Sequence, residues 1–298
     1  MAANTFTTFI PWNELKNPIY SQEGWSVKDA CMIEKDGMFY LFFSAFYWED
    51  GQERSHVVGV KSPDFRSWSE PLFNWRGKED GWLGMCSPNI IFVQGTYYLT
   101  YNSWGDKPGQ PNQLFYARSS DLEHWEHHLP LAQNLTGGTR AIDAAVIYAA
   151  PKYYLIWKEI QTAQIACCER MDGNWIRIGQ STDYWQENAH FIRMDGKYHL
   201  VLTARGQLTA IAPMLADGSQ DEHWTQWGDF RVFDVPRESF NTHEAANAGF
   251  LADWRDKDGF FYLLYAGTTE GHSHARRGDN RLGLARSRDL LHWQAPPQ

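Results

Sequence analysis

The feature that most constrains the fold of this chain is a pattern that recurs along it. Each copy reads as a short apolar strand, a tight turn and a second, aromatic-rich strand, which is the sequence signature of a β-hairpin. The first four copies are KDACMIEKDGMFYLFF (28–43), CSPNIIFVQGTYYLTY (86–101), IDAAVIYAAPKYYLIW (142–157) and QENAHFIRMDGKYHLV (186–201). A fifth copy, HEAANAGFLADWRDKDGFFYLLY (243–265), has a longer turn. The chain is therefore built from five related units.

A second motif, Ser-x-Asp-x-x-x-Trp, closes several units, at residues 62–68, 119–125 and 287–293. We interpret it as structural, with the Asp bonding the backbone of its own turn and the Trp packing between neighbouring units. Five units of roughly 45 to 60 residues, each with about four short strands and no amphipathic helix, predict an all-β fold. The specific prediction is a five-bladed β-propeller with four-stranded antiparallel blades. Residues 1–298 then form a single domain, closed with the help of the segment at 6–20.

Composition narrows the choice of partners. The net charge of −9 and the pI near 5.6 disfavour a nucleic-acid or anionic-membrane surface. The N-terminus lacks the regions of a signal peptide, and no segment approaches the ~20 apolar residues of a membrane span. The four Cys residues include no Cys-x-x-Cys pair, which disfavours a zinc cluster. We therefore expect a cytoplasmic protein, or a secreted one if a signal was removed, with no nucleic acid and no membrane as partner.

Carboxylates recur at one position of the repeat. Counting back eleven residues from a Tyr of each second strand (Tyr40, Tyr98, Tyr154 and Tyr198) gives Asp29, Ser87, Asp143 and Glu187. The first strand of each propeller blade lines the central channel, so three carboxylates should converge on one funnel. Like charges brought this close raise at least one pKa. Any one of them could simply bond a nearby backbone N–H, but three in phase favour function. Paired carboxylates across a sugar-sized cleft are the apparatus of glycoside hydrolysis.

The five units and the order Asp, Asp, Glu resemble the five-bladed propeller glycosidases, most nearly glycoside hydrolase family 43 with its arabinanase, arabinofuranosidase and β-xylosidase members. The resemblance covers essentially the whole chain. It implies that Asp29 is the general base and that Glu187 is the general acid. It also implies that Asp143 tunes the pKa of the acid and has an orienting role. Family members commonly have Pro after each Asp and near the Glu. Here Ala follows both Asp residues and Asn-Ala follows the Glu, so the chain is a divergent branch.

The activity that this resemblance implies is inverting hydrolysis of pentose-type glycosides, arabinofuranosyl or xylosyl, with an oligosaccharide or small glycoside as substrate. No organic cofactor is implied. Three alternatives stay open. One is a retaining β-fructosidase-like enzyme, and one is a non-catalytic carbohydrate-binding propeller. The third is a propeller phosphorylase, for which a cationic phosphate pocket could come from Arg276, Arg277 and Arg281.

Sugar contacts are expected from strand ends and loops on the carboxylate face. The candidates are Trp25, Phe46, Trp48, Ser87, Trp104, Lys158, Trp185 and Arg205. His243 resembles a blade-five His of the family that faces the channel and often holds a metal ion through water. The implied ion is calcium or another cation in the central channel. Calcium prefers oxygen ligands, so a single His would reach it only through water.

Overall fold

The structure is a computed structural model that describes residues 9–181, 186–204, 208–269 and 279–297, and within them the chain is almost entirely β-structure. The strands are β1 (Ser26–Lys35), β2 (Met38–Glu49), β3 (Gln52–Ser62), β4 (Phe73–Trp75), β5 (Gly84–Val93), β6 (Thr96–Trp104), β7 (Leu114–Ser119), β8 (Glu126–Pro130), β9 (Ile142–Ala149), β10 (Lys152–Glu159), β11 (Thr162–Cys168), β12 (Ile176–Gln180), β13 (Glu187–Met194), β14 (Lys197–Ala204), β15 (Leu208–Pro213), β16 (Arg231–Val232), β17 (Glu244–Trp254), β18 (Phe260–Thr268) and β19 (Arg281–Ser287). The short helices are η1 (Trp12–Glu14), α1 (Gln133–Thr136), η2 (Asp221–Thr225) and α2 (Arg255–Asp258). The all-β prediction is confirmed.

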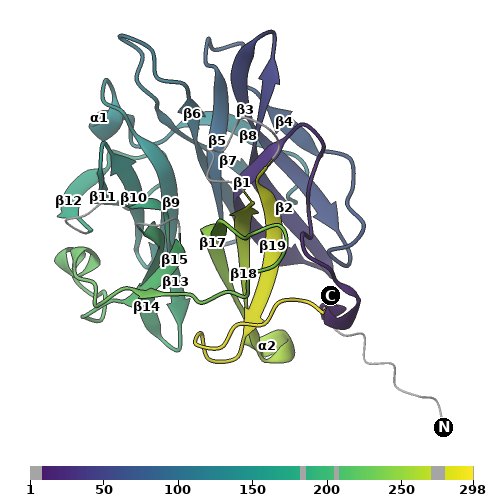
Figure 1. The fold of residues 1–298 in the computed structure, drawn as a ribbon. Coiled ribbons are helices and arrows are strands. Elements are labelled where there is room, and N and C mark those ends of the chain that lie inside the picture. The colour runs from purple at the N-terminus through teal and green to yellow at the C-terminus, as the bar shows by residue number, and fades with distance from the viewer. Residues whose placement is uncertain (1–8, 182–185, 205–207, 270–278, 298) are drawn as a thin grey trace.

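The strands form consecutive antiparallel groups, β1–β4, β5–β8, β9–β12, β13–β16 and β17–β19 (Figure 1). Short parallel bridges join the first group to the second, between Ser55 and Gly84, and the fourth to the fifth, between Leu208 and Ala246. The first strands also contact one another in cyclic order, β1 with β5, β5 with β9, β9 with β13, β13 with β17, and β17 with β1. The groups follow the predicted units. That these groups are the five blades of a propeller, and that the blades close into a ring, remain predictions.

Turn chemistry explains why the hairpins form where they do. Asp36 and Gly37 link β1 to β2, and both have positive φ, at 54° and 77°. Asp195 and Gly196 link β13 to β14 in the same way, at 50° and 78°. Positive φ at both central residues fits a type I′ turn, whose twist matches that of the flanking strands. The Asp-Gly pairs therefore fix the register of these two hairpins.

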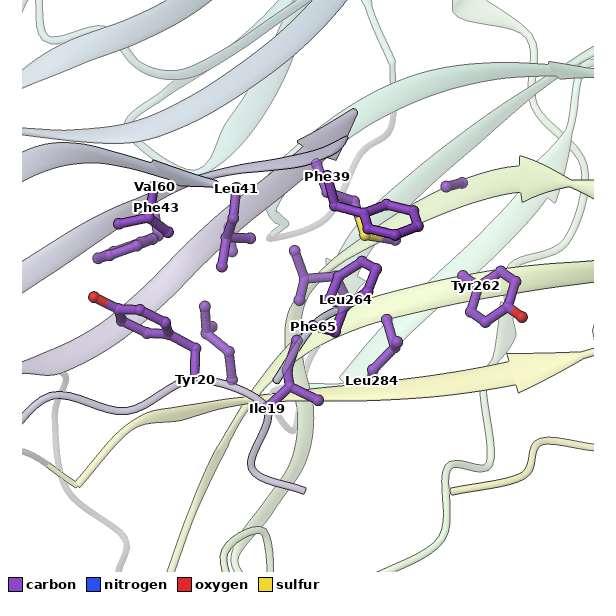
Figure 2. Packing of buried hydrophobic residues seen from close by; sticks show 14 of the residues in the cluster. Ile19, Tyr20, Phe39, Leu41, Phe43, Val60, Phe65, Tyr262, Leu264 and Leu284 are labelled. Atoms are coloured by element: carbon purple, nitrogen blue, oxygen red, sulfur yellow. The ribbon is translucent and has the colours of Figure 1, made fainter. Parts of the chain in front are cut away.

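One apolar cluster joins the two ends of the chain. It combines Ile19 and Tyr20 of the N-terminal segment with Phe39, Leu41 and Phe43 of β2 and with Tyr262, Leu264 and Leu284 of the last group (Figure 2). The same segment pairs with β19, because the Ile19 N–H donates to the Leu282 carbonyl at 2.8 Å and the Leu282 N–H donates to that of Tyr20 at 3.0 Å. The N-terminal segment thus holds the first strand group against the last.

The Ser-x-Asp-x-x-x-Trp motif is structural, as expected. Asp121 accepts the backbone N–H groups of Glu123 and His124 at 2.9 and 2.8 Å, so its carboxylate holds its own turn. Asp64 and Asp289 make the equivalent bonds. The motif's Trp125 packs edge-on against Phe42 of the preceding group, with ring centroids 5.7 Å apart. Each motif therefore fixes a turn, and this Trp also fills the space between two groups.

Candidate active site

A β-bulge interrupts the first strand of each group and re-aims one side chain. The residues inside the bulges are Asp29, Ser87, Asp143, Asn188 and Ala248, all with φ between 48° and 56°. A bulge places two residues opposite one and locally bends the strand. Left-handed backbone at a non-glycine residue is strained and persists only where the surroundings hold it. Two of the three predicted carboxylates, Asp29 and Asp143, occupy this special position.

Glu187 does not occupy it, which corrects the expectation that it shares the phase of Asp29 and Asp143. The pairing shows why: Tyr40 lies opposite Ile33 in the first group, and the equivalent residue of the fourth group is His199, opposite Ile192. The count of eleven residues therefore began one position too early. The bulge residue of β13 is Asn188, and Glu187 precedes it, at the position that Lys28 holds in β1.

All three carboxylates nevertheless line one pocket of about 320 Å³. A smaller cavity of about 20 Å³, the size of a single water, shares part of this wall and is lined by the bulge residues and their neighbours from all five first strands. The pocket wall also holds residues that are not among the predicted ones: Lys28, Cys86, Asn102, Asp106, Arg140 and Asn188. The structure thus brings Asp29, Asp143 and Glu187 together in one pocket.

Asp143 is almost as enclosed as Asp29, with 8% of the residue exposed against 6%. Ser87 Oγ donates to its Oδ1 at 2.7 Å, and the Asn188 N–H donates to its Oδ2 at 3.2 Å. Burial raises the pKa of Asp143, and the charges of Glu187 and Asp29 raise it further, against the opposing effects of Lys158 and the Ser87 hydrogen bond. The expectation that clustering raises at least one pKa is confirmed at this residue.

Two lysines accompany the other two carboxylates. Lys28 Nζ lies 3.3 Å from Asp29 Oδ1, and Asn188 Nδ2 donates to the same oxygen at 3.1 Å. Burial lowers the pKa of Lys28, but the charges of Asp29, Glu187 and Asp143 outweigh burial, so its pKa stands above its usual range. Lys158, only 5% exposed, donates from Nζ to Glu187 Oε1 at 2.6 Å. Lys28 is not among the predicted site residues, although it directly precedes Asp29 in the chain.

The other predicted contact residues divide into three sets. Phe46, Ser87 and Trp104 line the pocket, and the Phe46 and Trp104 rings meet edge-to-face with centroids 5.7 Å apart. Lys158 does not line the pocket but bonds Glu187, which does. Trp25 packs beside Tyr47, and Trp48 is 53% exposed. Neither Trp lines the pocket. Trp185 and Arg205 lie outside the described residues.

The expected channel cation finds little support in the side chains around the channel. His243 is exposed, and its backbone N–H bonds the Thr268 carbonyl at 2.9 Å. The imidazole buried in the small cavity is that of His190, whose Nε2 accepts the Leu251 N–H at 3.3 Å. Calcium takes six to eight oxygen ligands, and the carboxylates of Asp29 and Asp143 already have lysine, serine and amide partners. This set fits calcium poorly, and we derive no chemical step through an ion.

Comparison with known proteins identifies the class. The family model described as glycosyl hydrolases family 43 matches residues 15–226, so the chain belongs to that family and is a glycosidase. Among curated proteins none matches significantly.

Among the described residues, none of the helices has the length and apolar character needed to cross a membrane.

Solved structures with the same fold share little sequence with this chain. A glycosyl hydrolase from Bacteroides ovatus is 16% identical, with a TM-score of 0.66 over 94% of each chain. A family 43 enzyme from Xanthomonas citri, complexed with xylotriose, is 14% identical, with a TM-score of 0.64 over 90% of this chain and 89% of that one. An α-L-arabinofuranosidase from Lactobacillus brevis is 12% identical, with a TM-score of 0.66 over 90% and 92%. At these identities the similarity establishes the fold alone.

Proposed function

We propose that this protein is an inverting glycosidase that removes a pentose unit, arabinofuranosyl or xylosyl, from a short glycoside. The observation that carries the proposal is the single pocket that Asp29, Asp143 and Glu187 share in a chain of family 43. The pocket volume of about 320 Å³ lies at the low end of the ~300–1,000 Å³ of small-molecule sites. A short or terminal sugar segment suits that volume better than the interior of a long chain.

In the proposed mechanism, Glu187 gives its proton to the glycosidic oxygen as the bond to the anomeric carbon breaks. A water molecule attacks that carbon from the opposite face, and Asp29 takes the proton that this water loses. The Lys28 ammonium and the Asn188 amide both donate to Asp29, and both stabilise the negative charge that a base carries. Asp143 orients Asn188 by accepting its N–H. Inversion follows if the Asp29 and Glu187 carboxyl groups stand ~6.5–9.5 Å apart.

The sugar class rests on similar proteins and on the pocket wall. Structural neighbours include an exo-1,5-α-L-arabinanase, an α-L-arabinofuranosidase and a complex with xylotriose. Phe46 and Trp104 offer apolar ring faces at the pocket, against which the C–H surface of a sugar can pack. The fold that we propose for this site is a single-domain propeller of five blades. The cyclic contacts among β1, β5, β9, β13 and β17 support a closed ring.

An activity screen tests the proposal. The protein should hydrolyse 4-nitrophenyl α-L-arabinofuranoside or β-D-xyloside faster than the matching hexosides. Glu187→Gln should abolish turnover while xylotriose or arabinotriose still binds, because the amide keeps the shape of the side chain but has no acidic proton to give. A variant that retains full turnover would remove Glu187 from the mechanism.

Proton NMR of the first product separates inversion from the retaining alternative. An inverting enzyme releases the opposite anomer before mutarotation, whereas a retained anomer would favour the β-fructosidase-like mechanism. Turnover that requires inorganic phosphate would favour a phosphorylase. Of the arginines considered for phosphate, Arg281 is exposed in β19, and Arg276 and Arg277 lie outside the described residues. Binding without turnover on any substrate would favour a carbohydrate-binding module.

A further inference from the structure

Three side chains of the kind that bind metals gather away from the carboxylate pocket. Glu79 and Asp80 lie in the loop between β4 and β5, and His128 lies in β8, so two neighbouring strand groups contribute. One potential ligand atom of each residue lies within 4.8 Å of the other two. None of the three lines the pocket that holds Asp29. The proposed glycosidase reaction assigns them no part.

The imidazole of His128 is an independent indication that something binds here. Among the described residues, neither of its ring nitrogens has a hydrogen-bond partner, although both are buried, and the side chain is only 16% exposed. Buried polar atoms are nearly always paired, because leaving one unpaired is costly. Nε2 lies 4.0 Å from Glu79 Oε1, which is too far for a hydrogen bond. A ligand that both residues could share would satisfy this nitrogen.

The ring of His128 is also held in place. Its backbone N–H donates to the Tyr101 hydroxyl at 2.6 Å. The rings of Tyr101, Phe115 and Trp75 surround it, with centroids 5.8, 6.0 and 6.3 Å away. The carboxylates are free to adjust, since the Glu79 side chain is 65% exposed. A fixed imidazole beside two exposed carboxylates can close on an ion with little rearrangement.

We propose that Glu79, Asp80 and His128 bind a divalent first-row transition-metal ion, with Zn²⁺ as the representative. Nitrogen and carboxylate ligands lie ~2.0–2.2 Å from Zn²⁺, which sets neighbouring ligand atoms about 3–3.5 Å apart. The gap of 4.0 Å between Nε2 and Oε1 is therefore less than about 1 Å too wide, within reach of the exposed Glu79. Imidazole with two carboxylates suits this class of metal, whereas calcium would require six to eight oxygens.

An ion bound at this site would also affect the carboxylate pocket. The loop that carries Glu79 and Asp80 continues to Gly81, whose carbonyl accepts a hydrogen bond from Lys107 Nζ at 2.6 Å. Lys107 follows Trp104, Gly105 and Asp106, which line the carboxylate pocket. An ion held between β8 and this loop would therefore stabilise the wall of the pocket through the hydrogen bond between Gly81 and Lys107. The metal site extends the description of the protein beyond the proposed glycosidase and does not depend on it.

Calorimetric titration of the chelator-treated protein with Zn²⁺ tests the proposal. We expect one ion per chain. Glu79→Gln, Asp80→Asn and His128→Gln should each weaken binding at least tenfold. Co²⁺ should give visible absorption bands in the unaltered protein that these variants lose. His124→Gln is the matched control, because His124 is an exposed His already paired with Asp121 at 2.8 Å, and it should leave the affinity unchanged.

Three results would overturn the metal site. They are absence of Zn²⁺ binding, binding that the three ligand variants leave within twofold, and binding that His124→Gln removes. His128 packs among aromatic rings, so His128→Gln could fail to fold. Glu79→Gln and Asp80→Asn change exposed side chains, and their thermal unfolding in the absence of Zn²⁺ should match that of the unaltered protein. These two variants therefore decide the question on their own if the His128 variant is lost.

Discussion

Asp143→Asn should make the protein more stable at neutral pH. The pKa of Asp143 is raised by burial and by the charges of Glu187 and Asp29. An acid with a raised pKa in the folded protein contributes stability below the pKa of the unfolded chain, ~3.9 for Asp. That contribution is lost as the pH rises through the folded pKa, because the folded state must then ionise a buried group. Asn is neutral at every pH and avoids this loss.

The size of the effect follows from the same linkage. Asn is isosteric with Asp: its oxygen can keep the Asn188 N–H bond, and its amide can donate to Ser87 Oγ. The variant should therefore gain about 1.4 kcal/mol at pH 7 for each unit by which the folded pKa of Asp143 exceeds the unfolded value. For a chain of this length, 1 kcal/mol corresponds to a Tm increase of about 2 °C. The gain should shrink toward zero as the pH falls to about 4.

Urea unfolding of the two proteins at pH 7 and pH 4 measures this difference. Asp121→Asn is the control with the opposite sign, because backbone and side-chain hydrogen bonds from His124 and a backbone bond from Glu123 lower the pKa of Asp121. That substitution should destabilise the protein at pH 7. Our reading of the pocket would be refuted by an Asp143→Asn variant less stable than the unaltered protein at pH 7, or by a stability difference that does not change with pH.

Two further predictions concern catalysis. Lys158→Met should lower kcat about 10- to 100-fold, because Glu187 loses a charged hydrogen bond of ~1.5–3 kcal/mol. Lys158→Arg should retain most of the rate, because it keeps the positive charge. Equal losses of kcat in the two variants would argue against the ion pair at 2.6 Å. Trp104→Ala should raise KM about 2- to 10-fold with a smaller change in kcat, since ring stacking contributes ~0.5–1.5 kcal/mol. Trp48→Ala, at an exposed ring outside the pocket, should leave both constants unchanged.

Local chemistry made the strands and turns of this chain predictable from its sequence. Asp36-Gly37 and Asp195-Gly196 carry their own turn geometry, and the alternating apolar residues beside them define the strands. The Ser-x-Asp-x-x-x-Trp motif likewise depends on bonds within a few residues, such as those of Asp121. Features of this kind need no knowledge of the rest of the fold, which explains why the sequence revealed them.

The partners of the site residues were not predictable in this way, because they come from other strand groups. Lys158 on β10 bonds Glu187 on β13, and Asn102 on β6 accepts the backbone N–H of Asp143 on β9 at 2.9 Å. Nothing in the neighbourhood of either carboxylate in the sequence marks these contacts. Lys28 differs, since it stands beside Asp29 in the chain and could have been selected for that reason alone.

The one-residue offset of Glu187 has a chemical meaning that a strict repeat would not provide. Asp29, Asp143 and Asn188 share the bulge position, and Asn188 links the two carboxylates by donating its side-chain amide to one and its backbone N–H to the other. Successive side chains of a strand point to opposite faces, so the residue before the bulge is aimed differently. Glu187 accordingly reaches Lys158 instead of joining that network. An inverting glycosidase needs its acid and its base on opposite sides of the bond that breaks. A carboxylate displaced by one residue from the shared position is a simple way for a repeated fold to set one acid apart from the others.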